Sequence, residues 1–486
     1  MSFSCKAVFR CTVLFVLLMI PAMVVAQESA PASGSGGWQS KRPGWLLITP
    51  EQRAQVQTVA ENFKNYIDVA RTALASNREM IRQAKSEGFV EFTNAGQVKP
   101  GAKLIINNRD RALILVIVGS KPLTEGLHLI GTHQDSPHID LKARPVVQRD
   151  TLALFKTVYY GGIKKYQWAN IPLALVGRID TTDGRTIEVS IGLKPGEPVF
   201  VIPDNAPHSD KPLHTRTYND VLTGEELDPV AGSMPGDRTT SAEVMRQLTA
   251  TYKIKEEDLV SAELQLVPAS RPADVGIDRG LIGGYGQDDR LSSFCAARAL
   301  LDTQGTPRHS AIAYLTNFEE VGSGNTTGAG TEFFDTTLAR LIAAQQGGKY
   351  GDLELRTARH NALMISADTN DGMNPLFGEL TSEGSNAARL GYGVTLKMYG
   401  GGFDAPSELL AKIRAQLDRN QIPWQTQTQK VDIGGGGTIG GFFSRKDMNV
   451  VDLGVPLLSM HSPYEMSSKV DVWNFYRFMA AFFGEK

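Results

Sequence analysis

The sequence predicts an α/β fold, in which a sheet is flanked by helices and a β-containing domain is inserted into the chain. Three observations support this prediction. Several continuous apolar runs end abruptly in polar or glycine-rich residues, as strands buried on both faces do. Segments with the apolar spacing of helices lie between these runs. The 486-residue chain has room for two or three domains, and residues 146–262 differ in character from the rest.

Residues 1–26 have the pattern of a secretory signal peptide. A short basic start precedes an apolar stretch at 12–25, and small residues before Gln27 suit cleavage at that point. The alternative is an uncleaved N-terminal anchor. We expect an exported protein, periplasmic or extracellular, in which residues 27–43 form a flexible linker. We expect no stable membrane insertion after cleavage, because no second apolar run approaches about 18 residues.

The composition excludes several classes of protein. Hydrophobic residues make up 42% of the chain and charged residues 21%, which excludes a disordered or fibrous chain. The net charge is −2 and there is no basic run, so we expect no nucleic acid as a partner. Cleavage of the signal peptide would leave Cys295 as the single cysteine, and we therefore expect no internal disulfide bond.

The first element of the folded chain is predicted to be a helix that begins at Pro50. Thr49 can cap this helix, proline is favoured at its first position, and Gln52 completes a capping box. Apolar residues then recur at spacings of three and four, which predicts a helix face that packs on a core. These residues are Val56, Val59, Phe63, Ile67 and Ala70.

Strands and helices are predicted to alternate along the rest of the first domain. The predicted strands are ALILVIVG (112–119), LHLIG (127–131), SAIAYLTN (310–317), ALMISA (362–367) and VVDLGVPLLSM (450–460). The predicted helices are DRLSSFCAARALLD (289–302) and TTLARLIAAQ (336–345). Continuous apolar runs of this kind suit strands that have helices on both sides.

The segment at 146–262 is predicted to be a second, inserted domain. It contains short strand-like pieces such as LALVGRID and RTIEVSIG, many prolines, and a polar stretch from 204 to 240. The first domain is then discontinuous and consists of residues 44–145 and 263–486.

Residues that can bind metal ions follow several of the predicted strands. His133 and Asp135 follow LHLIG, Glu319 and Glu320 follow SAIAYLTN, Asp368 follows ALMISA, His461 follows VVDLGVPLLSM, and the pair Asp288–Asp289 precedes a helix. In open α/β sheets, ligands bind at the carboxyl ends of the strands. Each residue alone has a structural explanation, such as a helix N-cap for Asp288 or Asp289. The whole set favours a metal site.

Imidazole nitrogens and carboxylate oxygens are ligands of zinc, and catalytic zinc sites leave a position for water. Two metal ions about 3.5–4 Å apart can share a bridging carboxylate. Asp135, two residues after His133, is placed to accept the second N–H of the imidazole ring. Of the adjacent residues Glu319 and Glu320, one can be a ligand and the other a base.

One set of segments, spread along the chain, resembles a known family. The segments are GTHQDSPHIDLK, QDDRLSSF, FEEVGS, SADTND, GGGGTIGGF and VDLGVPLLSMHSPYEM. They resemble, in the same order, the signature segments of the aspartyl aminopeptidase family of dinuclear zinc exopeptidases. YGGIKKYQWANIPLALVGRI at 160–179 resembles the start of that family's inserted dimerisation domain. The resemblance implies the dinuclear zinc exopeptidase fold, a mixed sheet flanked by helices, with an inserted β-rich dimerisation domain.

The resemblance also implies roles for the residues of the site. His133 would bind one zinc ion, with Asp135 orienting it, and Asp288 would bridge two zinc ions. Glu319 would be the general base. The remaining metal ligands would be Glu320 and Asp368, on different zinc ions, and His461.

Lys397, in the segment GVTLKMY, falls where the family has a lysine implicated in binding an acidic substrate side chain. The alternative is an exposed charge on an edge strand. The family commonly has alanine and two histidines at the positions of Asn370, Asp371 and Asn374, and we find no counterpart of the histidine that its inserted domain supplies to a neighbouring subunit. These departures favour a looser or neutral substrate specificity.

The predicted function is that of a zinc-dependent aminopeptidase, which removes N-terminal residues from peptide substrates. Metal-activated water would attack the scissile carbonyl, with Glu319 as general base. We expect two Zn²⁺ ions per subunit, although the same ligands accept Co²⁺ or Mn²⁺. The resemblance implies a homo-oligomer, a shell of twelve subunits built through the insert. Two alternatives remain open: another dinuclear zinc hydrolase, such as a deacylase or carboxypeptidase, and a non-catalytic peptide-binding scaffold.

Overall fold

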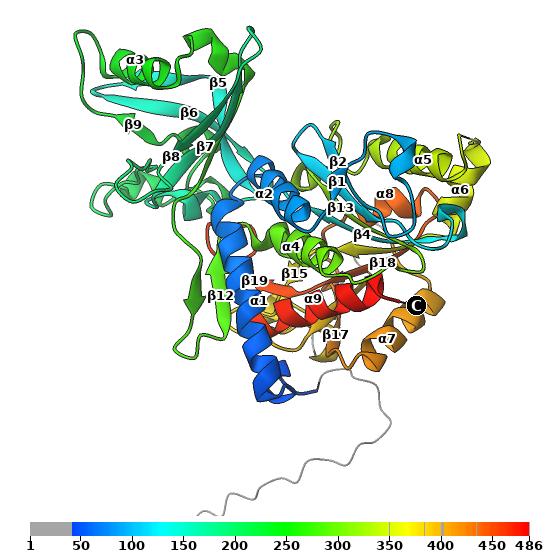
Figure 1. Ribbon diagram of the computed structural model, residues 1–486. Helices are drawn as coiled ribbons and strands as arrows, with labels where there is room; N and C mark the ends of the chain where they lie inside the picture. The colour runs from blue at the N-terminus through cyan, green and yellow to red at the C-terminus, as the bar shows by residue number, and fades with distance from the viewer. Residues whose placement is uncertain (1–40, 349, 383, 400–402, 434, 486) are drawn as a thin grey trace, which may run out of the picture. The chain divides into compact units, whose positions relative to one another are not determined.

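The computed structural model describes residues 41–348, 350–382, 384–399, 403–433 and 435–485. The predicted signal peptide at 1–26 and most of the predicted linker at 27–43 lie outside the described residues. The described residues belong to one compact unit. It contains both helices and strands, as the predicted α/β class requires (Figure 1).

The helices are α1 (Pro50–Val69), α2 (Ala73–Ser86), α3 (Thr240–Tyr252), α4 (Gln287–Leu301), α5 (Phe333–Gln345), α6 (Asp352–His360), α7 (Ser407–Arg419), α8 (Gly440–Ser444) and α9 (Lys469–Phe483). The strands up to the insert's end are β1 (Val90–Glu91), β2 (Lys103–Asn108), β3 (Ala112–Ile117), β4 (Leu127–His133), β5 (His138–Arg149), β6 (Leu152–Tyr160), β7 (Leu173–Asp180), β8 (Thr186–Ile191), β9 (Val230–Gly232) and β10 (Ala262–Pro268). The later strands are β11 (Ala273–Val275), β12 (Leu281–Gly284), β13 (Ser310–Thr316), β14 (Leu363–Ala367), β15 (Asn370–Asp371), β16 (Val394–Met398), β17 (Trp424–Thr428), β18 (Asn449–Gly454), β19 (Pro456–Leu458) and β20 (Glu465–Ser468).

The central sheet has the strand order β1-β2-β3-β13-β4-β14-β18-β16-β17. The strands β13, β4, β14 and β18 run parallel to one another, whereas β3 and β16 pair antiparallel with the two ends of this group. The predicted mixed sheet is therefore confirmed. Because β13, β4 and β14 are parallel neighbours, their carboxyl ends lie at the same edge of the sheet.

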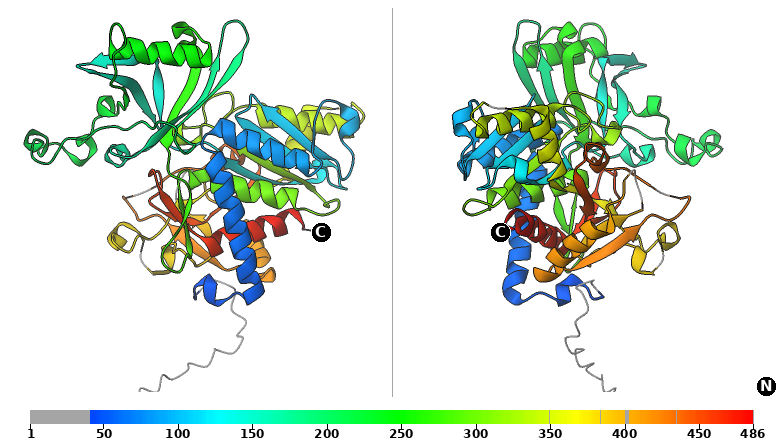
Figure 2. Two further views of the ribbon diagram at one scale, coloured as in Figure 1. Left: turned by 60° about the vertical axis from the view of Figure 1, so that its left-hand side comes forward. Right: turned by 90° about the vertical axis from the view of Figure 1, so that its right-hand side faces the viewer.

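Side chains of the central strands alternate between two hydrophobic cores. On β3, Leu113, Leu115 and Ile117 pack into the first core, whereas Ile114 and Val116 pack into the second. The first core also contains side chains of α1, α2, α4, α7 and α9, and the second contains side chains of α5, α6 and α8. Helices thus cover both faces of the sheet (Figure 2), which explains why the apolar runs of the strands are continuous.

Most of the predicted elements are confirmed. Helix α1 begins at Pro50, and the capping box forms: the N–H of Gln52 donates to Thr49 Oγ1 at 3.2 Å, and the N–H of Thr49 donates to Gln52 Oε1 at 2.9 Å. The runs at 112–119, 310–317 and 362–367 contain β3, β13 and β14, and β4 includes the run at 127–131 and continues to His133. The predicted helices correspond to α4 and α5.

The prediction of a single strand at 450–460 is wrong. The run forms β18 in the central sheet and then β19 in a third sheet, whose strand order is β11-β12-β20-β19-β15. The chain changes sheets at Gly454, where an added Cβ atom would lie 1.9 Å from the carbonyl oxygen of Asp368. Pro456, which follows, has no N–H to continue a ladder. His461 therefore follows a strand of the third sheet.

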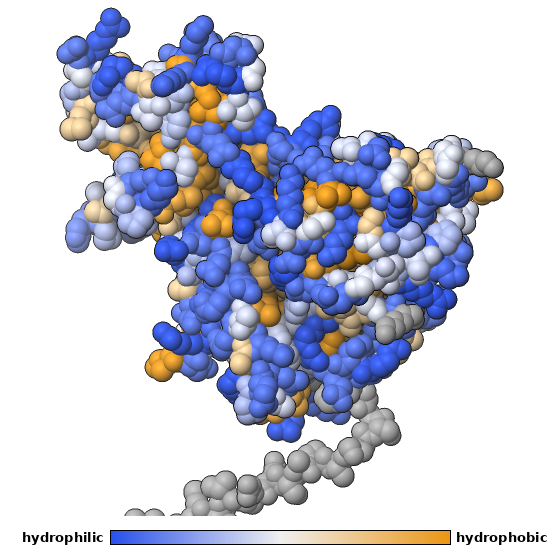
Figure 3. All heavy atoms as spheres, in the orientation of Figure 1, coloured by the Kyte–Doolittle hydropathy of each residue, from blue (hydrophilic) through white to orange (hydrophobic). Residues whose placement is uncertain are grey.

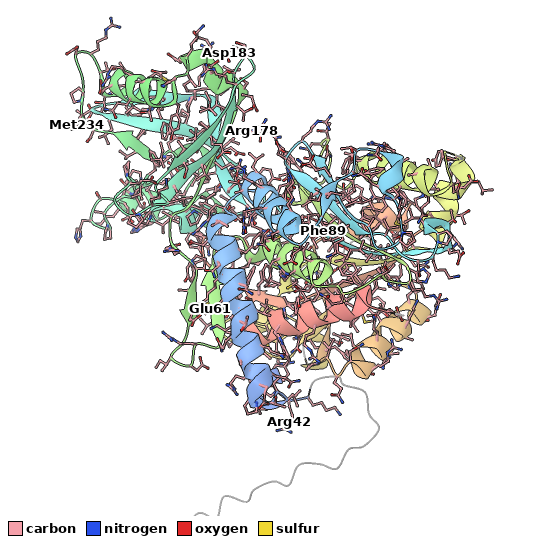
Figure 4. All side chains as sticks on the ribbon, in the orientation of Figure 1. Arg42, Glu61, Phe89, Arg178, Asp183 and Met234 are labelled. Carbon is pink, nitrogen blue, oxygen red and sulfur yellow. The ribbon has the colours of Figure 1, made fainter. Side chains whose placement is uncertain are left out.

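The insert has a sheet of its own, with the strand order β8-β7-β10-β5-β6-β9. In Figure 4, Arg178 marks β7 and Met234 marks the loop after β9. The sheet extends from His138 to Pro268, because β5 and β10 both continue beyond the predicted limits of 146–262. The division of the chain into an inserted domain and a discontinuous first domain stays a prediction.

Hydrophilic side chains cover most of the face shown in Figure 3, and apolar side chains gather around β7 and β9 of the insert. Within the described residues, no helix is both long enough and apolar enough to cross a membrane.

Candidate active site

Four of the predicted site residues lie at one edge of the central sheet. His133 is the last residue of β4, Glu319 and Glu320 belong to the 3-10 turn Glu319–Val321 after β13, and Asp368 follows β14. Since these three strands are parallel neighbours, they deliver the four side chains to a common place.

Asp288 lies between two histidines that come from different parts of the chain. Its Oδ1 is 3.6 Å from Nε2 of His133, and its Oδ2 is 3.1 Å from Nε2 of His461. Asp368 Oδ1 lies 3.7 Å from Nε2 of His133, and Glu320 Oε2 lies 3.4 Å from Nε2 of His461. The site thus consists of two adjacent groups, each with one histidine and one further carboxylate, which Asp288 joins.

Both histidines present Nε2 to the carboxylates because their Nδ1 atoms bond to backbone carbonyls. Nδ1 of His133 is 3.0 Å from the carbonyl oxygen of Asp135, and Nδ1 of His461 is 2.9 Å from that of Gly162. A carbonyl oxygen only accepts, so Nδ1 carries a proton and Nε2 is the nitrogen left to face a metal ion. This is the tautomer of a histidine that binds a metal ion through Nε2.

The electrostatics of the two groups favour bound cations. Asp288 Oδ1 and Glu320 Oε1 are buried and have no hydrogen-bond partner among the described residues, which is costly for carboxylates unless an ion satisfies them. Burial opposes protonation of His461, but Asp288 and Glu320 raise its pKa to about 10. Donor atoms lie within 4.8 Å of one another in the set His133, Asp288 and Glu320 and in the set His133, Asp289 and Asp368. Nitrogen and oxygen donors at this spacing fit zinc.

Asp135 supports His133 through its backbone as well as its side chain. Its carboxylate Oδ1 lies 3.4 Å from Nδ1 of His133, farther than the carbonyl oxygen. The carboxylate also accepts the N–H groups of Glu319 and Glu320 at 3.3 and 3.2 Å, and the hydroxyl of Tyr160 at 2.6 Å. Burial alone would raise the pKa of Asp135, but its hydrogen bonds outweigh burial and lower that pKa. Asp135 therefore anchors both a histidine and the turn that carries the two glutamates.

Glu319 and Glu320 occupy different positions in the site. Glu320 faces His461, whereas Glu319 Oε2 lies 3.9 Å from Nε2 of His133. Burial raises the pKa of Glu319 to about 7; the nearby His133 opposes the rise and the Asp368 carboxylate adds to it. A carboxylate with a pKa near neutrality at the edge of such a site can take up and release a proton.

Lys397 lies on β16 with its ammonium group between two carboxylates. Its Nζ is 3.7 Å from Asp368 Oδ2 and 3.7 Å from Asp452 Oδ1. The side chain is only 16% exposed, and β16 lies between β18 and β17, so the alternative of an exposed edge-strand charge is wrong. Much of the positive charge of Lys397 is already balanced by these two acids.

The site opens into a cavity of about 1070 Å³. One wall contains Asn370, Asp371 and Asn374, the three positions that depart from the family pattern. Both amide atoms of Asn370 are buried and lack a hydrogen-bond partner in the described part of the chain. The insert contributes Lys164 and Tyr218 to the lining, and Lys164 Nζ lies 5.9 Å from the centre of the Tyr218 ring.

Two residues have supporting roles that the sequence did not predict. Asp289 accepts the N–H of Thr369 at 3.2 Å and that of His133 at 3.5 Å, so it is not merely a helix cap. Glu465 accepts the N–H groups of Asp288 at 3.2 Å and His461 at 2.8 Å. Burial raises the pKa of Glu465 to about 8. The one available signal was that Glu465 lies four residues after His461 within a signature segment.

Comparisons with known proteins agree with this site. Residues 66–483 match the family model of the aminopeptidase I zinc metalloproteases (M18). A probable M18 family aminopeptidase 1 from Borrelia garinii is 35% identical over 457 residues, which cover 92% of this chain and 100% of that protein.

The chain is also similar to solved structures. The crystal structure of the M18 aminopeptidase from Thermotoga maritima is 36% identical, covers 92% of this chain and 99% of its own, and superposes with a TM-score of 0.86. The mApe1 dodecamer of S. cerevisiae, at 22% identity, shares the fold with a TM-score of 0.72, over 88% of this chain and 96% of that one. This chain therefore belongs to the M18 family of aminopeptidase I zinc metalloproteases.

Proposed function

We propose that this zinc metalloaminopeptidase works with two metal ions per chain. The observation that carries the proposal is the position of Asp288, whose two carboxylate oxygens face two different histidines. His133 and Asp368 would hold one ion and His461 and Glu320 the other, with Asp288 between them. Zinc is the metal of the family, and the same donors would also accept Co²⁺ or Mn²⁺.

Bound metal ions would polarise the scissile carbonyl and make a water molecule more acidic. Within this chain, Glu319 is the residue we propose to take the proton from that water and to deliver it to the leaving amine. This role is supported by the raised pKa of Glu319 and by its position beside His133, outside the two groups of proposed metal ligands. Asp135 would hold Glu319 and His133 in a fixed relation.

The other functions that the sequence allowed are not favoured. The matching family is one of aminopeptidases rather than deacylases or carboxypeptidases. A non-catalytic scaffold would not need the two histidines and three acids that lie together here with unsatisfied buried oxygens.

We propose further that the enzyme accepts neutral N-terminal residues and is not strictly specific for Asp or Glu. A lysine–carboxylate contact is worth about 4 kcal/mol at an effective dielectric constant of about 20, before desolvation. Lys397 already faces Asp368 and Asp452, which offset much of that attraction. Asp371 adds another carboxylate to the cavity wall, and this would repel an acidic substrate side chain.

A panel of chromogenic substrates tests both the activity and the specificity. Asp, Glu, Leu and Ala derivatives would be assayed with the zinc-loaded enzyme, together with N-acetylated forms of each. We expect cleavage of the free-amine substrates alone and comparable kcat/KM values for Leu and Ala. Cleavage of the acetylated forms would contradict an aminopeptidase, and an advantage of more than about 100-fold for Asp and Glu, lost in Lys397→Ala, would contradict the proposed specificity.

We also propose that the chain forms a homo-oligomer through the insert. Exposed apolar side chains mark this part of the surface (Figure 3), and extended apolar patches commonly mark protein contacts. They include Val158, Val199, Val221, Met234 and Val260. A dodecamer is the assembly described for mApe1, and a twelve-subunit shell is our proposal for this chain.

Finally, we propose that the protein is exported by the signal peptide at 1–26 and acts in the periplasm or outside the cell. The support is the sequence pattern alone. N-terminal sequencing of the protein from a cell fraction outside the cytoplasm is expected to begin at Gln27. Recovery of the uncleaved chain in the membrane fraction would favour the anchor instead.

A further inference from the structure

Strand β6 of the insert sheet ends directly beside the metal centre. Strand β6 ends at Tyr160, and the residues Tyr160, Gly161 and Gly162, here called the return segment, each contact a different part of the site. They come from a part of the chain that the assigned site residues do not include.

Tyr160 reaches the first histidine through Asp135. Its hydroxyl donates to Asp135 Oδ2 at 2.6 Å, and Oδ1 of the same carboxylate lies 3.4 Å from Nδ1 of His133. The ring of Tyr160 is fixed by stacking on His138, with ring centres 4.4 Å apart, and by an edge contact with Phe318 at 5.7 Å. Burial and the Asp135 carboxylate raise the pKa of Tyr160, so its hydroxyl stays a donor.

Gly162 reaches the second histidine directly. Its carbonyl oxygen accepts the Nδ1–H of His461 at 2.9 Å. This bond leaves Nε2 of His461 facing Asp288 and Glu320. The carbonyl can lie there only if the chain turns sharply after Tyr160.

Gly161 makes that turn and packs against a further acid of the site. Its φ is +74°, a left-handed conformation that favours glycine. An added Cβ atom would lie 3.1 Å from Pro137 Cγ and 3.4 Å from Glu320 Cβ. A side chain at this position would therefore press on Pro137 and touch Glu320 in the turn that carries both glutamates.

We propose that the return segment of the insert is a positioning element of the metal centre, which fixes the rings of both histidines and the place of Glu320. Hydrogen-bond partners behind metal ligands typically contribute about 10–100-fold to metal affinity. The proposal rests on the assignment of His133 and His461 as ligands. It extends that assignment because it makes the insert, and not the first domain alone, part of the metal-binding apparatus.

The first test compares Tyr160→Phe with Tyr159→Phe. The matched control removes a hydroxyl from the preceding residue, which is 46% exposed and points to the opposite face of β6. Metal-free protein would be titrated with zinc against a chromophoric chelator, and kcat and KM would be measured separately. For Tyr160→Phe we expect zinc affinity about 10–100-fold weaker at one of two sites and a lower kcat with little change in KM. For Tyr159→Phe we expect wild-type values.

The second test compares Gly161→Ala with Gly184→Ala. Gly184, in the turn between β7 and β8, has a similar φ of +86°, but an added Cβ atom there meets nothing within 4 Å. The two variants carry the same kind of backbone strain, so a difference between them reports the contact with Pro137 and Glu320. We expect Gly161→Ala to bind the second zinc ion at least about tenfold more weakly and Gly184→Ala to bind two as wild type does.

The outcomes separate this proposal from the proposed function. Zinc affinity in Tyr160→Phe within twofold of wild type would overturn the positioning role, even if the melting temperature falls. Failure of the wild-type chain to bind zinc would overturn the ligand assignment itself. If Gly161→Ala does not fold, the tyrosine pair still decides the question, because Phe keeps the ring contacts of Tyr160.

Discussion

Adjacent residues in the site have different tasks, and Glu319 and Glu320 show this best. The carboxylate of Asp135 accepts both of their N–H groups, at 3.3 and 3.2 Å, which fixes the turn. Glu320 then faces His461 at 3.4 Å, whereas Glu319 stands near His133 with a pKa raised to about 7. One short turn can thus supply both a ligand and a proton acceptor.

We expect Glu319→Gln to keep both metal ions and to lose about 10²–10⁴ in kcat, the usual contribution of a positioned general base. The amide retains the size of the side chain but cannot take a proton. Metal content by elemental analysis and steady-state kinetics on an aminoacyl substrate would measure both effects. Loss of metal from this variant would show that Glu319 coordinates.

We expect Glu320→Gln to weaken zinc binding, because it replaces a carboxylate beside His461 and Asp288 with a neutral amide. Zinc titration of the metal-free variant would measure the effect, with Glu319→Gln as the matched control one residue away. If the control were the variant that lost zinc, the roles of the two residues would be exchanged. Equal loss of zinc in both variants would contradict the assignment of Glu319 as the general base.

The positions of polar residues after predicted strands showed which site residues lie together. They did not show which other residues hold these side chains in place. His133, Glu319 and Asp368 each follow an apolar run, and runs are visible in a sequence. Glu465 and Gly162 act on His461 through backbone groups, and such contacts depend on the paths of distant segments. For the same reason, the pairing of Lys397 with Asp452 could not be predicted.

At the scale of elements, the start of helix α1 could be predicted because it depends on interactions between neighbouring residues. Its capping box forms as the sequence predicts. We expect Thr49→Ala to lower the free energy of unfolding by about 1 kcal/mol, because it removes an N-cap. Thr58→Ala is the matched control, since Thr58 lies on the same helix and its hydroxyl donates to the carbonyl of Ala54 within the helix. Equal thermal midpoints for the two variants would show that the cap contributes nothing measurable.

Helix α9 is joined to the loop before β16 by a buried carboxylate. Asp471 accepts the N–H groups of Gly391 at 2.5 Å and Gly393 at 2.7 Å. We expect Asp471→Ala to destabilise the chain by about 1–3 kcal/mol, because it leaves two buried donors without an acceptor. Glu61→Ala breaks the ion pair between the exposed Glu61 and the largely buried Lys64. It is expected to cost less than about 1 kcal/mol, because Lys64 keeps Asp274 as a second acidic partner. Chemical denaturation would compare the two.

The effect of Asp471 is also expected to depend on pH. Burial raises its pKa to about 7 in the folded chain, above the value of about 3.9 for an unfolded aspartate. Between these values the folded chain holds a proton that the unfolded chain lacks, so the contribution of Asp471 to stability falls as pH rises from about 4 to about 7. The difference in stability between wild type and Asp471→Ala should shrink over this range. A difference that grows with pH would show that the carboxylate is ionised in the fold.

The elements themselves could be predicted wherever burial on both faces made a run continuous, as in β3, β4, β13 and β14. The run at 450–460 was wrongly predicted to be a single strand, because two strands of different sheets follow each other almost directly and both are apolar. The ends of the insert sheet were missed for a related reason. Strand β5 begins at residue 138 and β10 ends at residue 268, and their pairing, of Ile139 with Leu266 and of Asp140 with Gln265, becomes visible only in the fold.

At the scale of the whole molecule, the metal ions are expected to serve catalysis rather than folding. Two large cores lie on either side of the central sheet, and neither contains His133 or His461. A chelator should therefore abolish activity and leave the far-UV circular dichroism spectrum largely unchanged. It should also lower the thermal midpoint, because zinc binds the folded state. Elemental analysis before chelation should find about two zinc ions per chain. Cooperative unfolding on chelation would show that the site is structural.

The oligomeric state is also a property of the whole molecule. If the insert forms the contacts of a closed shell, its exposed apolar side chains become buried between subunits. We expect light scattering to find an oligomer at micromolar concentration. Met234 and Val260, 74% and 60% exposed on the insert, are the test positions, and Leu353, 73% exposed on α6 of the first domain, is the control. The double variant Met234→Glu with Val260→Glu should shift the mass toward smaller species, because charges would have to be buried in the contact, whereas Leu353→Glu should not. A monomeric wild type would contradict the shell, and dissociation by Leu353→Glu alone would place the contacts outside the insert.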